Sequence, residues 1–144
     1  MKQILTIQEP KVTIKSAKDL FKEIKKIDID YSQENFLVIC LNTKNQVIDS
    51  SVLFKGGLDS CLLDPRTIFR YALLNNSSKI IIAHNHPSGN LKPSSEDEEV
   101  FYRLKEAGKT IELLVLDSIV FNETEFYSIL SGEKEGKNDN KNLL

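Results

Sequence analysis

The chain has 144 residues and a mass of 16.4 kDa, the size of one ordinary domain. Hydrophobic residues make up 40% of it and charged residues 28%, which excludes a wholly disordered protein, a collagen-like repeat and a coiled coil. The formal net charge of -2 supplies no overall positive field, so a strongly bound nucleic acid would need a local basic patch.

The first ten residues carry one lysine and a short apolar stretch broken by polar side chains, which does not match a secretory signal peptide. No apolar run approaches the roughly 20 residues that cross a bilayer. We therefore expect a cytoplasmic protein with no membrane contact.

The two cysteines, Cys40 and Cys61, are far apart and have no CxxC spacing. We interpret both as buried apolar side chains without a chemical role.

The first half of the chain predicts a helix, a hairpin and a second helix. Residues 16–27 have apolar side chains at helical spacing behind Ser16, a residue that can cap a helix. Two apolar, β-branched runs at 34–42 and 46–54 are separated by a short polar turn and predict a β-hairpin. Asp64 followed by Pro65 is a typical helix start and predicts a helix through about residue 76.

The second half predicts a strand, a helix and two more strands. Residues 79–84 form an apolar run typical of a buried strand, and a loop rich in turn residues separates it from a helix at 94–108, closed by Gly108. Strand-like runs follow at 110–121 and 125–130. This order predicts a mixed α/β fold in an α+β arrangement, with a central mixed β-sheet flanked by helices. We expect one domain over residues 1–130 and a polar, disordered tail over 131–144.

The only two histidines, His84 and His86, lie two residues apart at the end of the 79–84 run. Side chains at i and i+2 of a strand point to the same side, so both imidazoles can face one metal ion. Two surface histidines at a strand end would show the same pattern. The HxH spacing alone does not decide between these interpretations.

Ser94 and Asp97 follow in the first turn of the helix predicted after the loop. A carboxylate at Asp97 could complete a set of two histidines and one aspartate, leaving a fourth tetrahedral position for water, as in catalytic zinc sites. The same two residues also fit a variant of the capping box, in which serine and an acidic residue satisfy the helix start. Both interpretations can hold together.

Glu34 is the leading candidate for a general base. A metal-activated water needs a nearby group that removes its proton and is not itself a ligand. Glu34 is an acidic residue at the start of an apolar strand, where strand composition favours none. An exposed charge at a strand end is the alternative interpretation.

These residues carry a resemblance to a known family. The spacing of His84, His86, Ser94 and Asp97, with an upstream glutamate, resembles the JAMM motif of MPN-type metalloproteases. The stretch HNHPSGNLKPSSED closely resembles the RadC-like branch of the JAB/MPN family, once named as a DNA repair protein. The similarity covers roughly residues 10–130, with two departures. Longer relatives carry a helical, DNA-binding-like region ahead of this domain, and relatives tend to have Asp-His where this chain has Asp117 and Ser118.

The resemblance implies a cytidine-deaminase-like MPN/JAMM fold. It also implies one zinc ion per chain bound by His84, His86 and Asp97, with Glu34 as general base and acid and Ser94 as hydrogen-bond donor to the developing oxyanion. We therefore expect a zinc-dependent metallopeptidase or isopeptidase that hydrolyses a peptide-type amide bond in an unidentified protein or peptide substrate.

Two other functions stay open at this point. One is a non-catalytic interaction module with the same fold, which an open metal site argues against. The other is a nucleic-acid-processing protein associated with DNA repair. Against it, the segments near the predicted site carry few basic residues, so any binding to DNA is expected to be weak. The sequence indicates neither the oligomeric state nor whether zinc or another divalent ion is bound.

Overall fold

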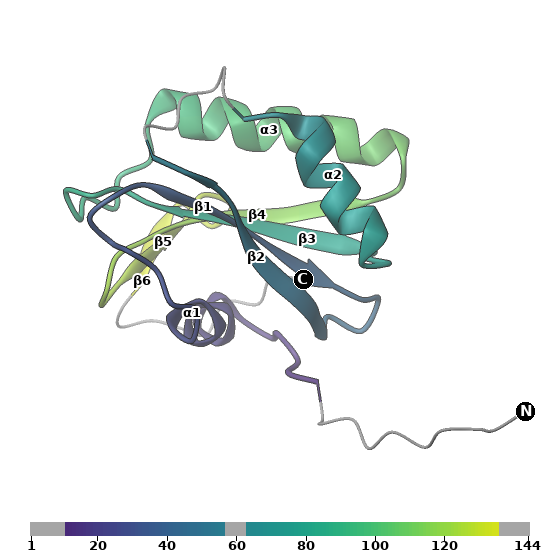
Figure 1. Ribbon diagram of the computed structural model, residues 1–144, viewed down its shortest axis with the longest axis horizontal. Coiled ribbons are helices and arrows are strands. Elements are labelled where there is room, and N and C mark those ends of the chain that lie inside the picture. The colour runs from purple at the N-terminus through teal and green to yellow at the C-terminus, as the bar shows by residue number, and fades with distance from the viewer. Residues whose placement is uncertain (1–10, 57–62, 136–144) are drawn as a thin grey trace, which may run out of the picture.

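The structure, a computed structural model, describes residues 11–56 and 63–135. Three helices and six strands occur in these ranges (Figure 1). In chain order they are α1 (Ala17–Lys25), β1 (Asn35–Leu41), β2 (Val47–Lys55), α2 (Pro65–Leu74), β3 (Lys79–Asn85), α3 (Ser95–Thr110), β4 (Leu114–Phe121), β5 (Phe126–Ser128) and β6 (Glu133–Glu135).

The strands form one sheet in the order β2-β1-β3-β4-β5-β6. Neighbouring strands are antiparallel except β3 and β4, which run parallel. A parallel pair needs a crossover connection, and α3 supplies it. Because a crossover helix runs back along the sheet, α3 begins near the end of β3. The loop between them therefore connects the end of a central strand to the start of a helix.

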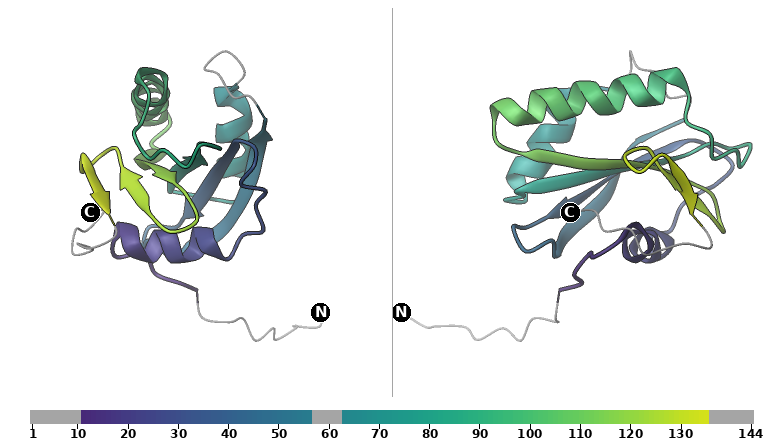
Figure 2. Two further views of the ribbon diagram at one scale, coloured as in Figure 1. Left: turned by 90° about the vertical axis from the view of Figure 1, so that its left-hand side faces the viewer. Right: turned by 180° about the vertical axis from the view of Figure 1, so that it is seen from behind.

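Helices cover both faces of the sheet. Figure 1 shows α2 and α3 on one face and α1 on the other, and the turned views of Figure 2 agree. The apolar core is divided in the same way: Ile80, Ile82 and Phe101 belong to the cluster under α2 and α3, whereas Leu20 and Ile81 belong to the cluster under α1. The mixed α/β fold with a central sheet flanked by helices is thus confirmed, and β3 lies at its centre, buried on both faces.

Local sequence signals explain where the first two helices begin. The Ser16 side chain accepts a hydrogen bond from the Asp19 N–H, and the Asp64 side chain accepts one from the Arg66 N–H at 2.9 Å with Pro65 at the first helical position. The predicted hairpin is present as the antiparallel pair of β1 and β2.

The prediction that Gly108 ends its helix is wrong. Helix α3 continues to Thr110, and Gly108 lies inside it, buried. A Cβ atom at Gly108 would come within 2.2 Å of the Leu113 carbonyl oxygen. The residue is therefore explained by the close approach of the chain that leads into β4, rather than by a left-handed cap.

We expected a disordered tail over residues 131–144, but residues 133–135 form β6 and pair with β5. The rest of that segment lies outside the described residues, as do Cys61 and residues 1–10.

Cys40 is buried in the core as predicted, and burial raises the pKa of its thiol. Within residues 11–56 and 63–135, no helix has the length and apolar character that a bilayer crossing requires.

Candidate metal centre

His84 lies near the end of β3 and His86 directly follows the strand, and both face the side of the sheet covered by α2 and α3. The even-numbered residues Ile80 and Ile82 pack in the core on that face, and His84 continues the same alternation. His84 is only 7% exposed, and the centroids of the two imidazole rings are 5.1 Å apart. The short spacing of the motif thus sets two imidazoles side by side.

Asp97 reaches these rings from the first turn of α3. The Ser94 side chain accepts a hydrogen bond from the Asp97 N–H at 3.0 Å, and Asp97 Oδ2 accepts one from the Ser94 N–H at 2.8 Å. This is a complete capping box. The capping interpretation is therefore confirmed, and the same carboxylate also faces both histidines.

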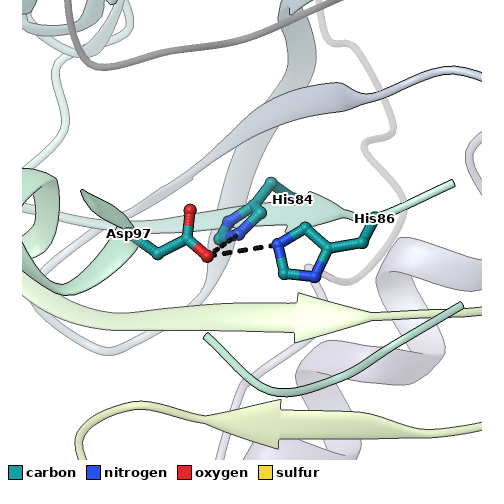
Figure 3. A group of neighbouring side chains, drawn as sticks. All are labelled: His84, His86 and Asp97. Carbon is teal, nitrogen blue, oxygen red and sulfur yellow. Dashed lines mark hydrogen bonds and ion pairs between the residues drawn. The ribbon is translucent and has the colours of Figure 1, made fainter. Parts of the chain in front are cut away.

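The three side chains converge through their ligand atoms (Figure 3). Asp97 Oδ2 lies 3.2 Å from His84 Nε2 and 3.1 Å from His86 Nε2. One ligand atom from each residue lies within 4.8 Å of the others. Ligands about 2.0–2.1 Å from a tetrahedral zinc ion are about 3.3 Å from one another. The observed separations from Asp97 are close to that value.

Both ring nitrogens of His86 are within hydrogen-bond distance of an acceptor. Nδ1 lies 2.8 Å from the Asn90 carbonyl oxygen, and Nε2 lies 3.1 Å from Asp97 Oδ2. A metal ion at this point would take the place of the proton on Nε2, while Nδ1 kept its bond to Asn90. His84 Nε2 is buried, and its contact with Asp97 lacks hydrogen-bond geometry. Among the described residues it therefore has no hydrogen-bond partner. A metal ion would satisfy this atom, so the residues fit the cation that the sequence predicts.

The site also shifts the ionisation of its members. The hydrogen bond with Asp97 raises the pKa of His86, and burial opposes this shift. For Asp97, burial disfavours the charged form, but contacts with His84 and His86 outweigh it and hold the pKa of the carboxyl below its usual range. The carboxylate is thus ionised at neutral pH, as a metal ligand requires.

Glu34 lies near His86. It directly precedes β1, in which Phe36 is opposite His84. This antiparallel register, continued by two residues, sets Glu34 across from His86. The charge of Glu34 adds to the raised pKa of His86, after the larger effect of Asp97. The register therefore brings Glu34 near His86, although the two residues lie far apart in the sequence.

The Ser94 hydroxyl lies at the exposed edge of this group. Its oxygen accepts the Asp97 N–H, and within the described ranges its own O–H has no hydrogen-bond acceptor. The hydroxyl proton is therefore available to a bound molecule. Ser94 can cap the helix and donate to a bound molecule at the same time, because the cap uses the hydroxyl oxygen as an acceptor and the donation uses its proton.

Sequence reasoning missed the residues that support the loop between β3 and α3. The Asn122 amide donates to the Gly89 carbonyl oxygen at 3.0 Å, which fixes the loop whose Asn90 carbonyl faces His86. No local pattern identifies this contact.

Asp117 is separate from the candidate metal centre. Its carboxylate accepts hydrogen bonds from the Ser128 hydroxyl and from the Leu130 N–H, which join β4 to the chain after it.

The sequence matches a known family across most of its length. Residues 14–136 match the model of the RadC-like JAB domain. A UPF0758 protein of Staphylococcus haemolyticus is 39% identical over 132 residues, which are 92% of this chain and 57% of that protein. A UPF0758 protein of Methanosarcina barkeri is 36% identical over 123 residues, 85% of this chain and 54% of that protein.

A third relative, from Staphylococcus aureus strain bovine RF122, is 42% identical over 110 residues, 76% of this chain and 48% of that protein. The chain thus spans about half the length of the curated relatives that it matches, and their names state no activity. The extent of the family match and the identity to these relatives show that the chain belongs to the RadC-like JAB domain family.

Proposed function

We propose that this protein is a metal-dependent hydrolase of peptide-type amide bonds, a zinc metallopeptidase or isopeptidase. The observation that carries the proposal is the buried His84 Nε2, which has no hydrogen-bond partner among the described residues and faces the same point as His86 Nε2 and Asp97 Oδ2. Three protein ligands leave one tetrahedral position open, which is the arrangement of catalytic rather than structural zinc sites.

His84, His86 and Asp97 would hold the ion. A divalent metal bound there lowers the pKa of a coordinated water and polarises a carbonyl oxygen. Two imidazoles and a carboxylate suit zinc, and they also suit other first-row divalent ions. The metal content of the purified protein, measured by elemental analysis, identifies the ion. We expect about one zinc per chain.

Glu34 would act as the general base and then as the general acid. Its carboxylate accepts a proton from the attacking water and donates it to the nitrogen of the leaving amine. The Ser94 hydroxyl donates a hydrogen bond to the oxyanion that develops on the carbonyl. Both roles agree with the location of these groups: Glu34 lies across from His86, and the Ser94 O–H is unused by the capping box.

The decisive variant is Glu34→Gln, measured on a peptide that wild type cleaves from a broad library. Glutamine is nearly isosteric with glutamate and cannot carry the proton, so turnover should fall about 10²–10⁴-fold while the metal content stays the same. Glu106→Gln is the matched control, because Glu106 lies on α3 and pairs with Lys109 at 3.3 Å. Unchanged turnover in Glu34→Gln would refute the mechanism.

Two results would favour another function. A metal-loaded wild-type protein that cleaves no member of the library would support the interaction module. Metal-dependent cleavage of a DNA strand, or tight binding to DNA that resists salt, would support nucleic-acid processing.

A further inference from the structure

Asn85 lies between the two histidines on β3, and its side chain is 1% exposed. Alternation along the strand turns it away from the face that carries His84 and His86. It therefore contributes no ligand, although its neighbours on both sides are the imidazoles of the candidate metal centre. A buried amide needs hydrogen bonds, because an unpartnered polar group in the interior is costly.

The Asn85 amide makes these bonds with the two peptide groups that flank Glu34. Its Oδ1 accepts a hydrogen bond from the backbone N–H of Asn35 at 2.8 Å, and its Nδ2 donates to the carbonyl oxygen of Gln33 at 3.0 Å. One of these groups belongs to the peptide bond before Glu34 and the other to the peptide bond after it. The side chain thus continues the β1–β3 ladder beyond its last backbone pair, Phe36 with His84.

Other contacts hold the same segment. The Gly56 N–H donates to the Glu34 carbonyl oxygen at 2.9 Å, from the end of β2. The Asn35 side-chain amide donates to the Asp30 carbonyl oxygen at 2.9 Å and to that of Gln33 at 3.0 Å. The backbone around Glu34 is therefore fixed from both neighbouring strands, and Asn85 is its attachment to the strand that bears the histidines.

An amide suits this position because it carries a donor and an acceptor side by side. The N–H of Asn35 needs an acceptor, and the carbonyl of Gln33 accepts a second hydrogen bond beside the one from the Asn35 side chain. An aspartate at position 85 would meet the first requirement and set a second acceptor against the Gln33 carbonyl. A leucine would meet neither.

We propose that Asn85 is a positioning residue for Glu34. Its amide fixes the backbone of Glu34 to β3, so that the carboxylate is held at a constant distance from the histidines that flank Asn85. The catalytic consequence rests on the proposed function, in which Glu34 moves the proton. The positioning itself is measurable without catalysis.

The test compares wild type, Asn85→Leu and Ser128→Ala, each loaded with Co²⁺, a divalent ion that the same donor set accepts. NMR measures the paramagnetic relaxation of the Glu34 side-chain protons, which falls steeply with distance from the metal. Ser128→Ala is the matched control: Ser128 is also buried, and its hydroxyl donates to Asp117 at 2.5 Å in another part of the sheet.

We expect the relaxation of the Glu34 protons to fall severalfold in Asn85→Leu and to stay unchanged in Ser128→Ala. Zinc affinity, measured by competition with a chromophoric chelator, should change by less than about threefold, whereas loss of a residue that supports a ligand costs about 10–100-fold. Unchanged relaxation in Asn85→Leu would overturn the proposal. A loss of zinc affinity with unchanged Glu34 relaxation would also overturn it, since Asn85 would then support the ligands alone.

Catalysis gives a second, independent readout on a peptide that wild type cleaves. Asn85→Leu should lower kcat by about 10²-fold with KM unchanged, the order of loss expected for a misplaced catalytic group. It should cause no further loss in the Glu34→Gln background, and losses that multiply would contradict the proposal. If wild type cleaves nothing, the proposed function fails, and the relaxation of the Glu34 protons still decides whether Asn85 positions that side chain. If Asn85→Leu does not fold, Asn85→Asp takes its place in the same measurements.

Discussion

Ser94→Ala separates the two roles of the residue at the start of α3. The substitution removes the oxygen that accepts the Asp97 N–H at 3.0 Å. Loss of a serine cap to alanine costs about 1 kcal/mol of the free energy of unfolding, which lowers Tm by roughly 3–5 °C in a domain of this size. The Ser94 backbone N–H, which donates to Asp97 Oδ2 at 2.8 Å, survives in the variant. Asp97 should therefore keep its orientation, and zinc affinity should be unchanged.

Two further variants distinguish the effect of the cap on stability from the effect of the hydroxyl on turnover. Ser94→Gly removes the hydroxyl but costs only about a few tenths of a kcal/mol, because glycine is tolerated at N-caps. Ser94→Thr keeps the hydroxyl. We expect the alanine and glycine variants to lose the same roughly 10²–10³-fold in turnover while differing in stability, and the threonine variant to retain both properties.

The measurements are thermal unfolding of the metal-loaded proteins, zinc competition, and hydrolysis of a peptide that wild type cleaves. Wild-type turnover in Ser94→Ala would refute the oxyanion role. Equal stability of the alanine and glycine variants would refute the capping energy. A large loss of zinc affinity would mean that the backbone half of the capping box does not hold Asp97.

Three further predictions concern the metal, the packing of α3 and the pH dependence of stability. His84→Ala and Asp97→Ala should each lose the metal found by elemental analysis, because two ligands remain; full occupancy in both would refute the ligand set. Gly108→Ala should lower the free energy of unfolding by about 1–3 kcal/mol in chemical denaturation, because its Cβ would lie 2.2 Å from the Leu113 carbonyl oxygen, and a stabilised variant would contradict this. Burial raises the pKa of Asp117, against its hydrogen bonds, so the folded state holds this proton more tightly than the unfolded state. The contribution of Asp117 to stability should fall as pH rises through its folded pKa, read as the difference between wild type and Asp117→Asn, and a difference that grew with pH would contradict this.

Local patterns were sufficient to predict much of the fold. Ser16, Asp64 and Ser94 cap their helices as expected, since capping depends on residues only two or three positions apart. The apolar runs predicted the central strands for the same reason. Strand β6 was missed because its three residues, Glu133–Glu135, are polar and are ordered by pairing with β5.

The contacts between distant segments were beyond such reasoning. The spacing of His84, His86 and Asp97 suggested a common site because all three lie within 14 residues of sequence. The bridge from Asn85 to the segment around Glu34 had no such signal, because it joins residues 50 positions apart. The position of Asn85 between two histidines does not indicate its role. The role becomes clear only from the register of β1 against β3.

The capping box at the start of α3 links helix formation to the occupancy of the candidate metal centre. Asp97 Oδ2 accepts the Ser94 N–H and also faces both imidazoles, so a cation held there is bound only when the first turn of α3 is formed. By mass action, a ligand at 100 times its Kd stabilises the folded state by about 2.7 kcal/mol. Protection of the first amides of α3 from hydrogen exchange should therefore increase when a divalent ion binds to His84, His86 and Asp97.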